Sequence, residues 1–184
     1  ARELWAGTQR SGVWRLRDGR WTAFTARGAS SPWGVFGFAQ QPGKTAQGWL
    51  WAATDQGVAR FDGQQWELLR GFGAWDAARL RHVDLHQDDG RPVLWASSVR
   101  LGVARFDVSD PRSPRLLPTV ELPPPPDGTV YSALRDAAGH TYLCTNNGVQ
   151  QLQRDPQGRW RDRIFRRRDG LVHDFVLFDL DDID

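Results

Sequence analysis

The sequence predicts an all-β fold of the β-propeller class, built from four four-stranded blades of about 45 residues each. Three observations support this prediction. One type of segment recurs four times at a nearly constant spacing. Short runs alternate apolar and polar residues, as half-buried strands do, and Asp-Gly dipeptides typical of hairpin turns lie between them. No longer segment carries the apolar stripe of an amphipathic helix.

Length and composition fit a single folded domain. The chain has 184 residues, of which 40% are hydrophobic and 25% are charged, a balance typical of globular proteins. The 24 basic side chains nearly balance the 22 acidic ones, and the two signs alternate along the chain, so we expect no nucleic-acid partner. No apolar run approaches the roughly 20 residues of a membrane span, so we expect no membrane contact by this segment.

An aromatic anchor marks each repeat. The anchors are Trp5, Trp51, Trp95 and Tyr142, which lie 46, 44 and 47 residues apart. A Gly-Val pair follows each anchor, at Gly12-Val13, Gly57-Val58, Gly102-Val103 and Gly148-Val149. A small residue lies two positions after each anchor, which suits crowding near a ring axis. We therefore expect the lone cysteine, Cys144, to be a structural residue.

Within each repeat we expect four strands, A to D. The B strands contain the aromatic anchors and the C strands follow the Gly-Val pairs. The expected A strands are Val35–Phe38, Leu80–Leu85, Val130–Leu134 and Phe175–Leu180. The expected D strands surround Trp21, Trp66, Leu116–Val120 and Trp160. The corresponding blade units are 1–33 plus 172–184, 34–78, 79–128 and 129–171.

The phase of the chain against the repeat suggests how the blades close. The sequence opens within strand B of one unit and ends after strand A of a fourth. Phe175–Leu180 would then complete the sheet that contains Trp5 and Trp21, and strands from both termini would close a four-blade ring. A four-blade arc of a larger ring and half of a dimeric ring are the alternatives.

These repeats resemble the two-component regulator propeller repeat. Leu4–Thr8 matches that family's L-W-x-G-T strand, and Asp169–Leu171 with Phe175-Val176 matches its D-G-L-x-x-x-x-V connector. Asp136–Gly139 and Asp88–Gly90 are similar to its D-x-x-G turn. The resemblance implies a periplasmic or otherwise extracytoplasmic sensor segment of a bacterial hybrid histidine kinase or diguanylate cyclase. The third unit departs from the pattern, because a proline run replaces its D-strand aromatic residue.

Two groups of polar residues invite a catalytic or metal-binding interpretation. His82, Asp84 and His86 alternate along a predicted strand and share one face, but a structural metal site usually needs four ligands, so we expect no metal. Asp88-Asp89 and Asp181-Asp182 are adjacent turn residues, whereas glycoside hydrolysis needs two carboxylates across a cleft. We expect these aspartates to form turns.

No other motif indicates catalysis. Neither Gly34–Gly37 nor Gly71–Gly73 is expected to lead into a helix, so a phosphate-binding loop is unsupported. The sequence also lacks the nucleophile and zinc motifs of hydrolases. We therefore expect no cofactor and no enzyme in this segment, and the resemblance places any kinase or cyclase domain outside it.

We expect ligand binding where the B–C and D–A loops meet, because these loops surround one mouth of a propeller's central channel. The candidate ligand-binding residues are Arg10, Trp33, Asp55, Trp75, Asp76, Arg100, Asn146, Arg167 and His173. Their aromatic, amide and charged groups suit a sugar-like or anionic small ligand. The alternative for each is a turn-forming role, least so for Trp33 and Trp75, since strand periodicity requires no tryptophan in a loop.

The sequence thus predicts a non-catalytic, ligand-binding sensor propeller that signals to an output domain. Its partner would be an unidentified small ligand or a protein. One alternative is a scaffold for protein interaction or self-assembly, including a homodimer. Another is a propeller lyase or hydrolase.

Overall fold

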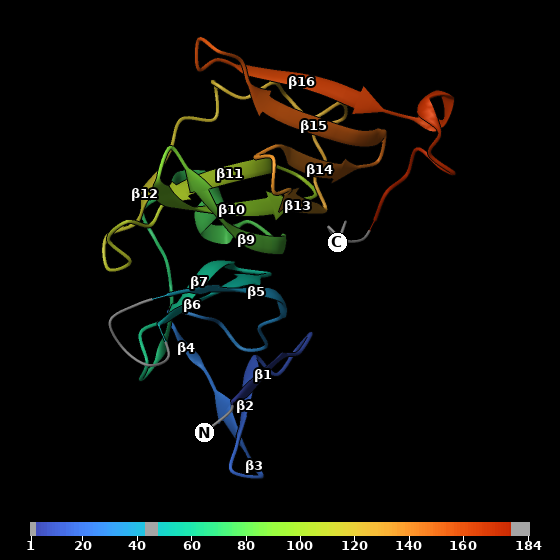
Figure 1. The fold of residues 1–184 in the computed structure, drawn as a ribbon. Coiled ribbons are helices and arrows are strands. Elements are labelled where there is room, and N and C mark those ends of the chain that lie inside the picture. The colour runs from blue at the N-terminus through green and yellow to red at the C-terminus, as the bar shows by residue number, and fades with distance from the viewer. Residues whose placement is uncertain (1–2, 43–47, 178–184) are drawn as a thin grey trace. The chain divides into compact units, whose positions relative to one another are not determined.

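The computed structural model describes residues 3–42 and 48–177, which form four sheets joined by turns and loops (Figure 1). The prediction of an all-β chain is confirmed. Contacts divide the chain into an N-terminal unit, residues 1–83, and a C-terminal unit, residues 84–184, and each is described by itself. No helix in the described part is long and apolar enough to cross a membrane.

The first sheet has three antiparallel strands in the order β1-β2-β3. They are β1 (Leu4–Gly7), β2 (Val13–Arg17) and β3 (Arg20–Phe24). The hairpin between β2 and β3 turns at Asp18 and Gly19, whose φ angles are 50° and 76°. Two successive positive φ angles match the twist of the flanking strands, which explains the Asp-Gly signal.

The second sheet has five strands in the order β4-β8-β7-β6-β5. Its strands are β4 (Ala26–Arg27), β5 (Val35–Gln41), β6 (Trp49–Thr54), β7 (Gly57–Phe61) and β8 (Trp66–Leu68). The parallel strand β4 was not predicted, and it covers the outer edge of β8. The 3₁₀ helix η1 (Gly73–Ala77) corrects the expectation that no helix follows Gly71–Gly73.

The third sheet has the order β12-β11-β10-β9. Its strands are β9 (Leu80–Asp88), β10 (Arg91–Ser98), β11 (Gly102–Asp107) and β12 (Arg115–Leu116). The D strand predicted at Leu116–Val120 is wrong in extent, since only Arg115 and Leu116 are paired as a strand. Pro118 has no backbone N–H to donate, and its carbonyl instead accepts a hydrogen bond from the Arg105 side chain at 2.9 Å.

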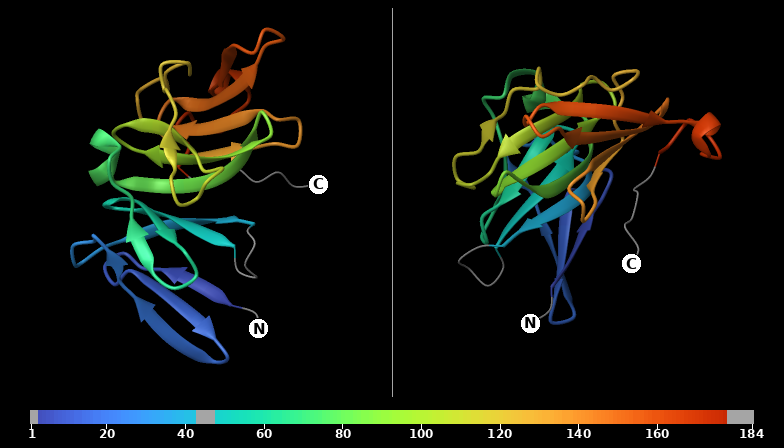
Figure 2. Two further views of the ribbon diagram at one scale, coloured as in Figure 1. Left: turned by 90° about the vertical axis from the view of Figure 1, so that its left-hand side faces the viewer. Right: turned by 45° about the horizontal axis from the view of Figure 1, so that its top comes forward.

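The fourth sheet has the order β13-β14-β15-β16 (Figure 2). Its strands are β13 (Ser132–Arg135), β14 (Thr141–Thr145), β15 (Gly148–Arg154) and β16 (Trp160–Phe165). The short 3₁₀ helix η2 (Arg167–Asp169) follows β16. Strand β13 begins two residues later than the predicted A strand, Val130–Leu134.

A hydrogen bond that recurs at three of the four B–C turns connects the turn with the start of the next A segment. Val35 N donates to Thr8 O at 2.8 Å, and Val130 N donates to Ser98 O at 3.2 Å. Val176 N donates to Thr145 O at 3.0 Å in the same way, although residues 175–177 are not in a strand. The rest of the predicted strand Phe175–Leu180 lies outside the described residues. Within those residues the first sheet has three strands.

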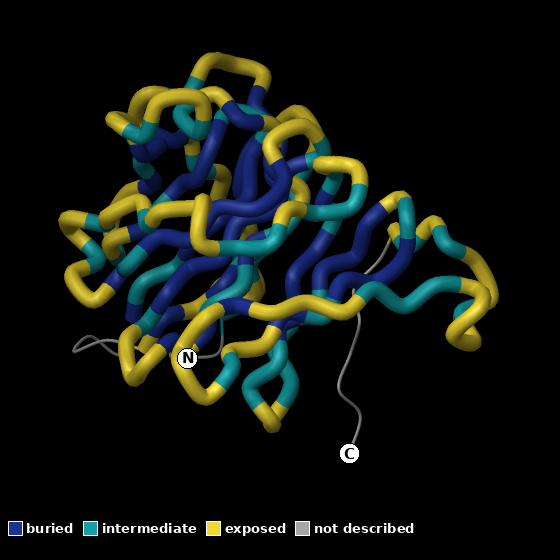
Figure 3. Tube along the Cα trace, turned by 90° about the horizontal axis from the view of Figure 1, so that it is seen from above, coloured by how far each residue is buried: buried dark blue, intermediate teal, exposed yellow. Residues whose placement is uncertain are grey.

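Each unit has a core cluster that contains buried aromatic residues, and the buried parts of the chain are dark blue in Figure 3. In the N-terminal unit, the Trp5 ring lies 4.8 Å from the Phe61 ring and 5.8 Å from the Trp66 ring. In the C-terminal unit, the Trp95 and Trp160 rings lie 6.0 Å apart and nearly perpendicular. These edge-to-face contacts attach the anchor strand of one sheet to the D strand of the next.

A cross-strand pair that sequence reasoning missed accompanies each anchor. Trp95 lies opposite Arg105, and the equivalent pairs are Trp5 with Arg15, Trp51 with Arg60, and Tyr142 with Gln151. The Arg105 guanidinium lies between the Trp95 and Trp160 rings, 5.7 and 5.6 Å from their centres, and its side chain is only 2% exposed. The buried cation thus helps to join two sheets.

Candidate functional site

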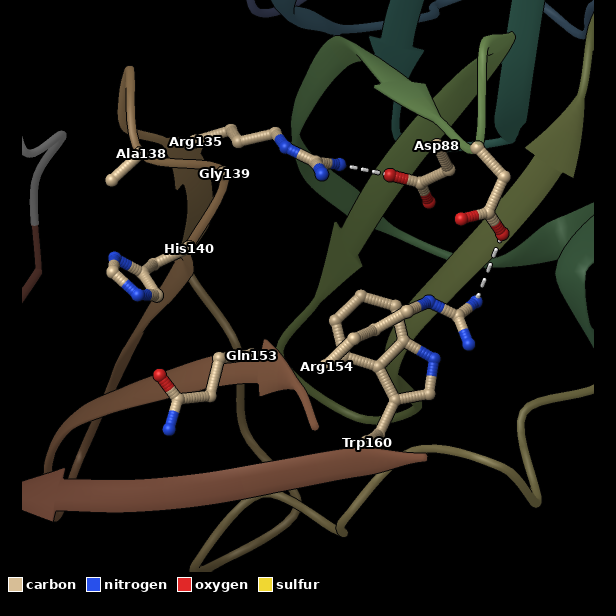
Figure 4. Close-up of a pocket in the computed structure, with 9 residues that line it drawn as sticks. Asp88, Arg135, Ala138, Gly139, His140, Gln153, Arg154 and Trp160 are labelled. Atoms are coloured by element: carbon tan, nitrogen blue, oxygen red, sulfur yellow. Dashed lines mark hydrogen bonds and ion pairs between the residues drawn. The ribbon is translucent and has the colours of Figure 1, made fainter. Parts of the chain in front are cut away.

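A cavity of about 290 Å³ lies in the C-terminal unit (Figure 4). The residues that line it are Asp88, Asp89, Arg135, Ala138, Gly139, His140, Gln153, Arg154 and Trp160. Two carboxylates, two guanidinium groups, an imidazole and an amide therefore surround a space at the lower end of the range for small-molecule sites.

Three hairpins bring these residues together. Strands β9, β13 and β15 all end at the same side of their sheets, and the turns that follow them supply the lining. Asp88 ends β9 and Asp89 follows it in the turn to β10, while Ala138, Gly139 and His140 come from the turn between β13 and β14. In the predicted blade notation, these are the A–B and C–D turns, which lie opposite the predicted B–C and D–A loops.

A buried ion pair fixes one wall of the cavity. Arg135 extends from the end of β13 and pairs with Asp88, whose side chain is only 5% exposed. The indole N–H of Trp95 also donates to Asp88, at 3.3 Å. The two donors hold the Asp88 carboxylate in place and compensate its buried charge. Removing either donor would leave this charge poorly compensated.

The opposite wall carries a more accessible cation. The guanidinium carbon of Arg154 lies 4.5 Å from the ring centre of Trp160, and this stacking orients the side chain (Figure 4). Arg154 pairs with Asp89 at 3.6 Å, but the Asp89 side chain is 60% exposed. An exposed pair of this kind contributes less than about 1 kcal/mol, so a ligand carboxylate could replace Asp89 at little cost.

His140 belongs to a hydrogen-bonded network on the fourth sheet. Its Nδ1 lies 2.9 Å from Asp136 Oδ2, which also accepts a hydrogen bond from the Tyr142 hydroxyl at 3.0 Å. Gln151 Nε2 donates in turn to the Tyr142 hydroxyl at 2.8 Å. Partial burial raises the pKa of Asp136, but the hydrogen bonds from His140 and Tyr142 outweigh it, and the pKa lies below its ordinary value.

In the N-terminal unit, the sequence-predicted site residues mostly support loops. Trp33 is 4% exposed and belongs to the core, and Arg10 is exposed in a turn. Asp55 accepts a hydrogen bond from Gly34 N at 2.9 Å. Asp76 accepts from the backbone of Gly71 and Phe72 at 2.9 and 2.8 Å, and Trp75 lies half-buried beside it in η1. The two aspartates therefore have the turn-forming contacts given as the alternative.

In the C-terminal unit, the four predicted residues lie at the B–C and D–A loops and none of them lines the cavity. Arg100 is exposed in the turn after β10. Asn146 accepts a hydrogen bond from the Tyr131 hydroxyl at 2.8 Å, and Arg167 N donates to Asp174 at 2.6 Å. His173 Nδ1 accepts from Phe175 N at 2.9 Å. Ligand binding by these residues stays a prediction.

The histidines on β9 have no metal-site geometry. Residues 3–42 and 48–177 contain no group of three His, Cys, Asp or Glu side chains that could hold a metal ion. His86 is 3% exposed, packs 5.2 Å from the Trp95 ring and pairs with Asp84 at 3.0 Å. The pair thus stabilises the strand.

The fold is similar to solved propeller-type domains. No protein-family model matches the chain, and no curated protein matches its sequence. Two structures of the extracellular domain of BT4673 from B. thetaiotaomicron, described once as a one component and once as a hybrid two component system, align with TM-scores of 0.56 and 0.59. Their identities are 15% and 16%, and the alignments cover 85% and 87% of this chain but only 21% and 20% of theirs.

A third similar structure is YCF48 bound to D1 peptide. It aligns with a TM-score of 0.53 and 14% identity over 86% of this chain and 50% of its own. At these identities the likeness establishes the fold, so the propeller-like all-β architecture is confirmed. One of the two BT4673 structures is described as part of a hybrid two component system, which is the type of receptor that the resemblance of the repeat motifs implies. The chain spans about a fifth of the length of the BT4673 domain.

Proposed function

We propose that this chain is a ligand-binding sensor module of a bacterial signal-transduction receptor and lies outside the cytoplasm. The fold likeness to the BT4673 extracellular domain, over 85% or more of the chain, carries this proposal. The L-W-x-G-T and D-G-L motifs support it from the sequence. In this function the segment is non-catalytic, and an output domain elsewhere in the receptor responds to ligand occupancy.

For the ligand we propose a small organic anion that binds in the cavity of the C-terminal unit. Arg154 is the anchor, since Trp160 and a hydrogen bond to Gly158 O at 2.5 Å orient its guanidinium, and its carboxylate partner, Asp89, is exposed. Gln153 and His140 supply hydrogen-bonding groups on the other side of the cavity (Figure 4). The volume of about 290 Å³ suits a molecule of the size of a dicarboxylate or a monosaccharide acid.

A thermal-shift screen tests this proposal. Sugar acids, dicarboxylates and neutral sugars are each mixed with the wild-type chain and with Arg154→Gln. We expect at least one anion to raise the Tm of the wild type and to bind Arg154→Gln at least about tenfold more weakly. Arg159→Gln is the matched control, because Arg159 is exposed, pairs with Asp155 within the turn between β15 and β16, and does not line the cavity.

Two outcomes would contradict it. One is a screen in which no anion stabilises the wild type. The other is equal weakening by Arg154→Gln and Arg159→Gln, which would mean that the ligand responds to net charge rather than to the cavity.

The second candidate function is docking of a protein. YCF48, which has a similar fold, is described in complex with a D1 peptide, and the first sheet has the exposed apolar residues Leu4 and Trp21.

The architecture that we propose is four blade units, 1–33 plus 172–184, 34–78, 79–128 and 129–171. Closure by strands from both termini stays a prediction, and small-angle scattering tests it, since a closed ring and an open arc differ in radius of gyration.

A further inference from the structure

The carboxylates and guanidinium groups that line the cavity of the C-terminal unit are balanced in sign. Asp88 and Asp89 carry negative charge, and Arg135 and Arg154 carry positive charge. A simple anion binds best where positive charge is in excess, because like charges repel each other at short range. The balance of charge in this cavity therefore favours a ligand that itself carries both signs.

The two ion pairs of the cavity differ in how firmly they are held. Asp88 is 5% exposed and accepts hydrogen bonds from Arg135 and from the Trp95 indole, so its charge is compensated within the protein. Asp89 is 60% exposed and lies 3.6 Å from Arg154, which is beyond hydrogen-bond distance. The pair of Asp89 with Arg154 is therefore the one that a ligand can open.

Arg154 keeps a donor for a ligand carboxylate. Its Nη1 donates to Gly158 O at 2.5 Å, and its Nη2 forms the pair with Asp89. The Trp160 ring stacks against the guanidinium at 4.5 Å and orients it (Figure 4). Nη2 can therefore donate to a ligand carboxylate while the bond to Gly158 and the ring contact stay as they are.

Opening this pair sets a requirement on the ligand. A ligand carboxylate that binds Arg154 leaves the Asp89 carboxylate without a cation and close to a second negative charge, which weakens the complex. An ammonium group on the same ligand removes this cost, because it becomes the new partner of Asp89. One ion pair is then exchanged for two, and the charge in the cavity stays balanced.

Arg135 and Gln153 provide donors for a further acidic group. A guanidinium has five N–H donors, and the single carboxylate of Asp88 cannot occupy all of them. The Gln153 side chain adds two amide N–H donors, and Figure 4 shows it on the side of the cavity away from Asp88. Donors on both sides of the cavity favour a ligand with a carboxylate at each end.

We propose that the ligand of this cavity is an acidic α-amino acid, of the type of glutamate or aspartate. Its α-carboxylate binds Arg154, and the α-ammonium on the same carbon binds Asp89, which lies beside Arg154. Its side-chain carboxylate binds at Gln153 and Arg135. This inference rests on the proposed ligand site and narrows its organic anion to one that carries an ammonium group. Asp89 is the residue that determines this selectivity.

Isothermal titration calorimetry with L-glutamate and with glutarate, which lacks only the ammonium group, tests the proposal. We expect the wild-type chain to bind glutamate at least about tenfold more tightly than glutarate. Asp89→Asn should bind glutamate at least about tenfold more weakly than the wild type, because the ammonium loses its anionic partner. The same variant should bind glutarate about threefold more tightly, because no carboxylate of the protein then competes for Arg154. L-aspartate and succinate form a second matched pair of ligands.

Asp18→Asn is the matched control. Asp18 lies in the hairpin turn between β2 and β3 with a φ angle of 50°, against 52° for Asp89, and each is followed by a glycine with positive φ. The Asp18 side chain is 76% exposed and does not line the cavity. Asparagine tolerates this backbone conformation, so both variants keep their turns. Asp18→Asn should bind glutamate and glutarate as the wild type does.

The outcomes separate this inference from the proposed function. Equal binding of glutamate and glutarate by the wild type, or equal weakening of both by Asp89→Asn, overturns the amino-acid ligand but leaves an anion site at Arg154. The same conclusion follows if another anion binds and neither glutamate nor aspartate does. Equal weakening of glutamate binding by Asp89→Asn and Asp18→Asn overturns the inference as well, because net charge would then be the cause. If no anion binds, the inference and the proposed ligand site both fail.

Discussion

Trp21 and Trp66 hold the same place in successive repeats, yet one is 46% exposed and the other is fully buried. Both lie near the start of a D strand, and both lie opposite the large apolar residue of the C strand, Leu16 or Phe61. The difference comes from the neighbouring sheet, since Trp5 of the first sheet packs against Trp66. A repeat position thus determines the residue type, whereas the neighbouring sheet determines how much that residue stabilises the fold.

The largest expected effect is the difference between these two tryptophans. Trp66→Ala should lower the free energy of unfolding by about 3–5 kcal/mol, because it leaves a cavity among buried rings. Trp21→Ala should cost less than about 1 kcal/mol, because the exposed ring loses few contacts. Urea denaturation at a concentration where the chain is monomeric measures both. Similar losses for the two variants would refute the comparison.

The cross-strand arginines extend the comparison to charged residues. Arg105 is 2% exposed and lies between two indole rings, whereas Arg15 is 20% exposed and lies over the Trp5 ring at 5.6 Å. Arg105→Ala should lower the free energy of unfolding by about 2–4 kcal/mol, and Arg15→Ala by about 1 kcal/mol. Guanidinium denaturation with tryptophan fluorescence reports both, and a larger loss for Arg15→Ala would contradict the assignment of Arg105 to the sheet interface.

Gly148 and Gly158 have similar backbone conformations but differ in whether another atom lies close to the position of a Cβ. Gly148 and Gly158 both have positive φ angles, 105° and 77°. A Cβ on Gly148 would lie 2.2 Å from Phe165 O, but a Cβ on Gly158 would meet no atom within 4 Å. We expect Gly148→Ala to cost about 2–3 kcal/mol and Gly158→Ala about 1 kcal/mol in thermal unfolding. Equal costs would show that backbone conformation alone requires glycine.

The smallest effect concerns the polar network of the fourth sheet. The pKa of Asp136 is lowered, so its carboxylate stabilises the folded state above its unfolded pKa of about 3.9, and this contribution is lost as the pH falls through the lower folded pKa. Asp136→Asn should cost about 1 kcal/mol at pH 7 and flatten the pH dependence of stability below about pH 4. Urea midpoints between pH 2.5 and 7 measure this. An unchanged slope would mean that other carboxylates dominate the acid transition.

The positions of most strands could be predicted from the sequence because each repeat carries the same short sequence pattern. The aromatic anchor, the Gly-Val pair and the Asp-Gly turn are each determined within a few residues, so the B and C strands were predicted close to their observed positions. The A strand at Phe175–Leu180 lies partly outside the described residues. The extent of β12 was predicted wrongly because Pro118, which lies inside the predicted segment, cannot donate to a strand ladder, and its carbonyl binds the side chain of Arg105 from the neighbouring strand instead.

The candidate site could not be predicted in the same way. Its walls come from three turns in two sheets, and nothing in one repeat shows that Arg135 meets Asp88, 47 residues away. Asp88 and Asp89 were interpreted only as turn residues. A usable signal was present at Arg154 and Trp160, which lie opposite each other across the hairpin from β15 to β16. An arginine opposite an aromatic residue at the end of a strand pair indicates an oriented cation.

The most direct test of the account follows the tryptophan indole N–H resonances by NMR while an anion found in the screen is titrated into the chain. We expect the Trp160 resonance to shift with saturation, because Arg154 and the cavity lie against its ring, while the Trp66 resonance stays in place. A shift confined to Trp33 and Trp75 would contradict the account, because it would place the ligand at the B–C and D–A loops. No shift at any tryptophan on addition of a stabilising anion would also contradict a site beside Trp160.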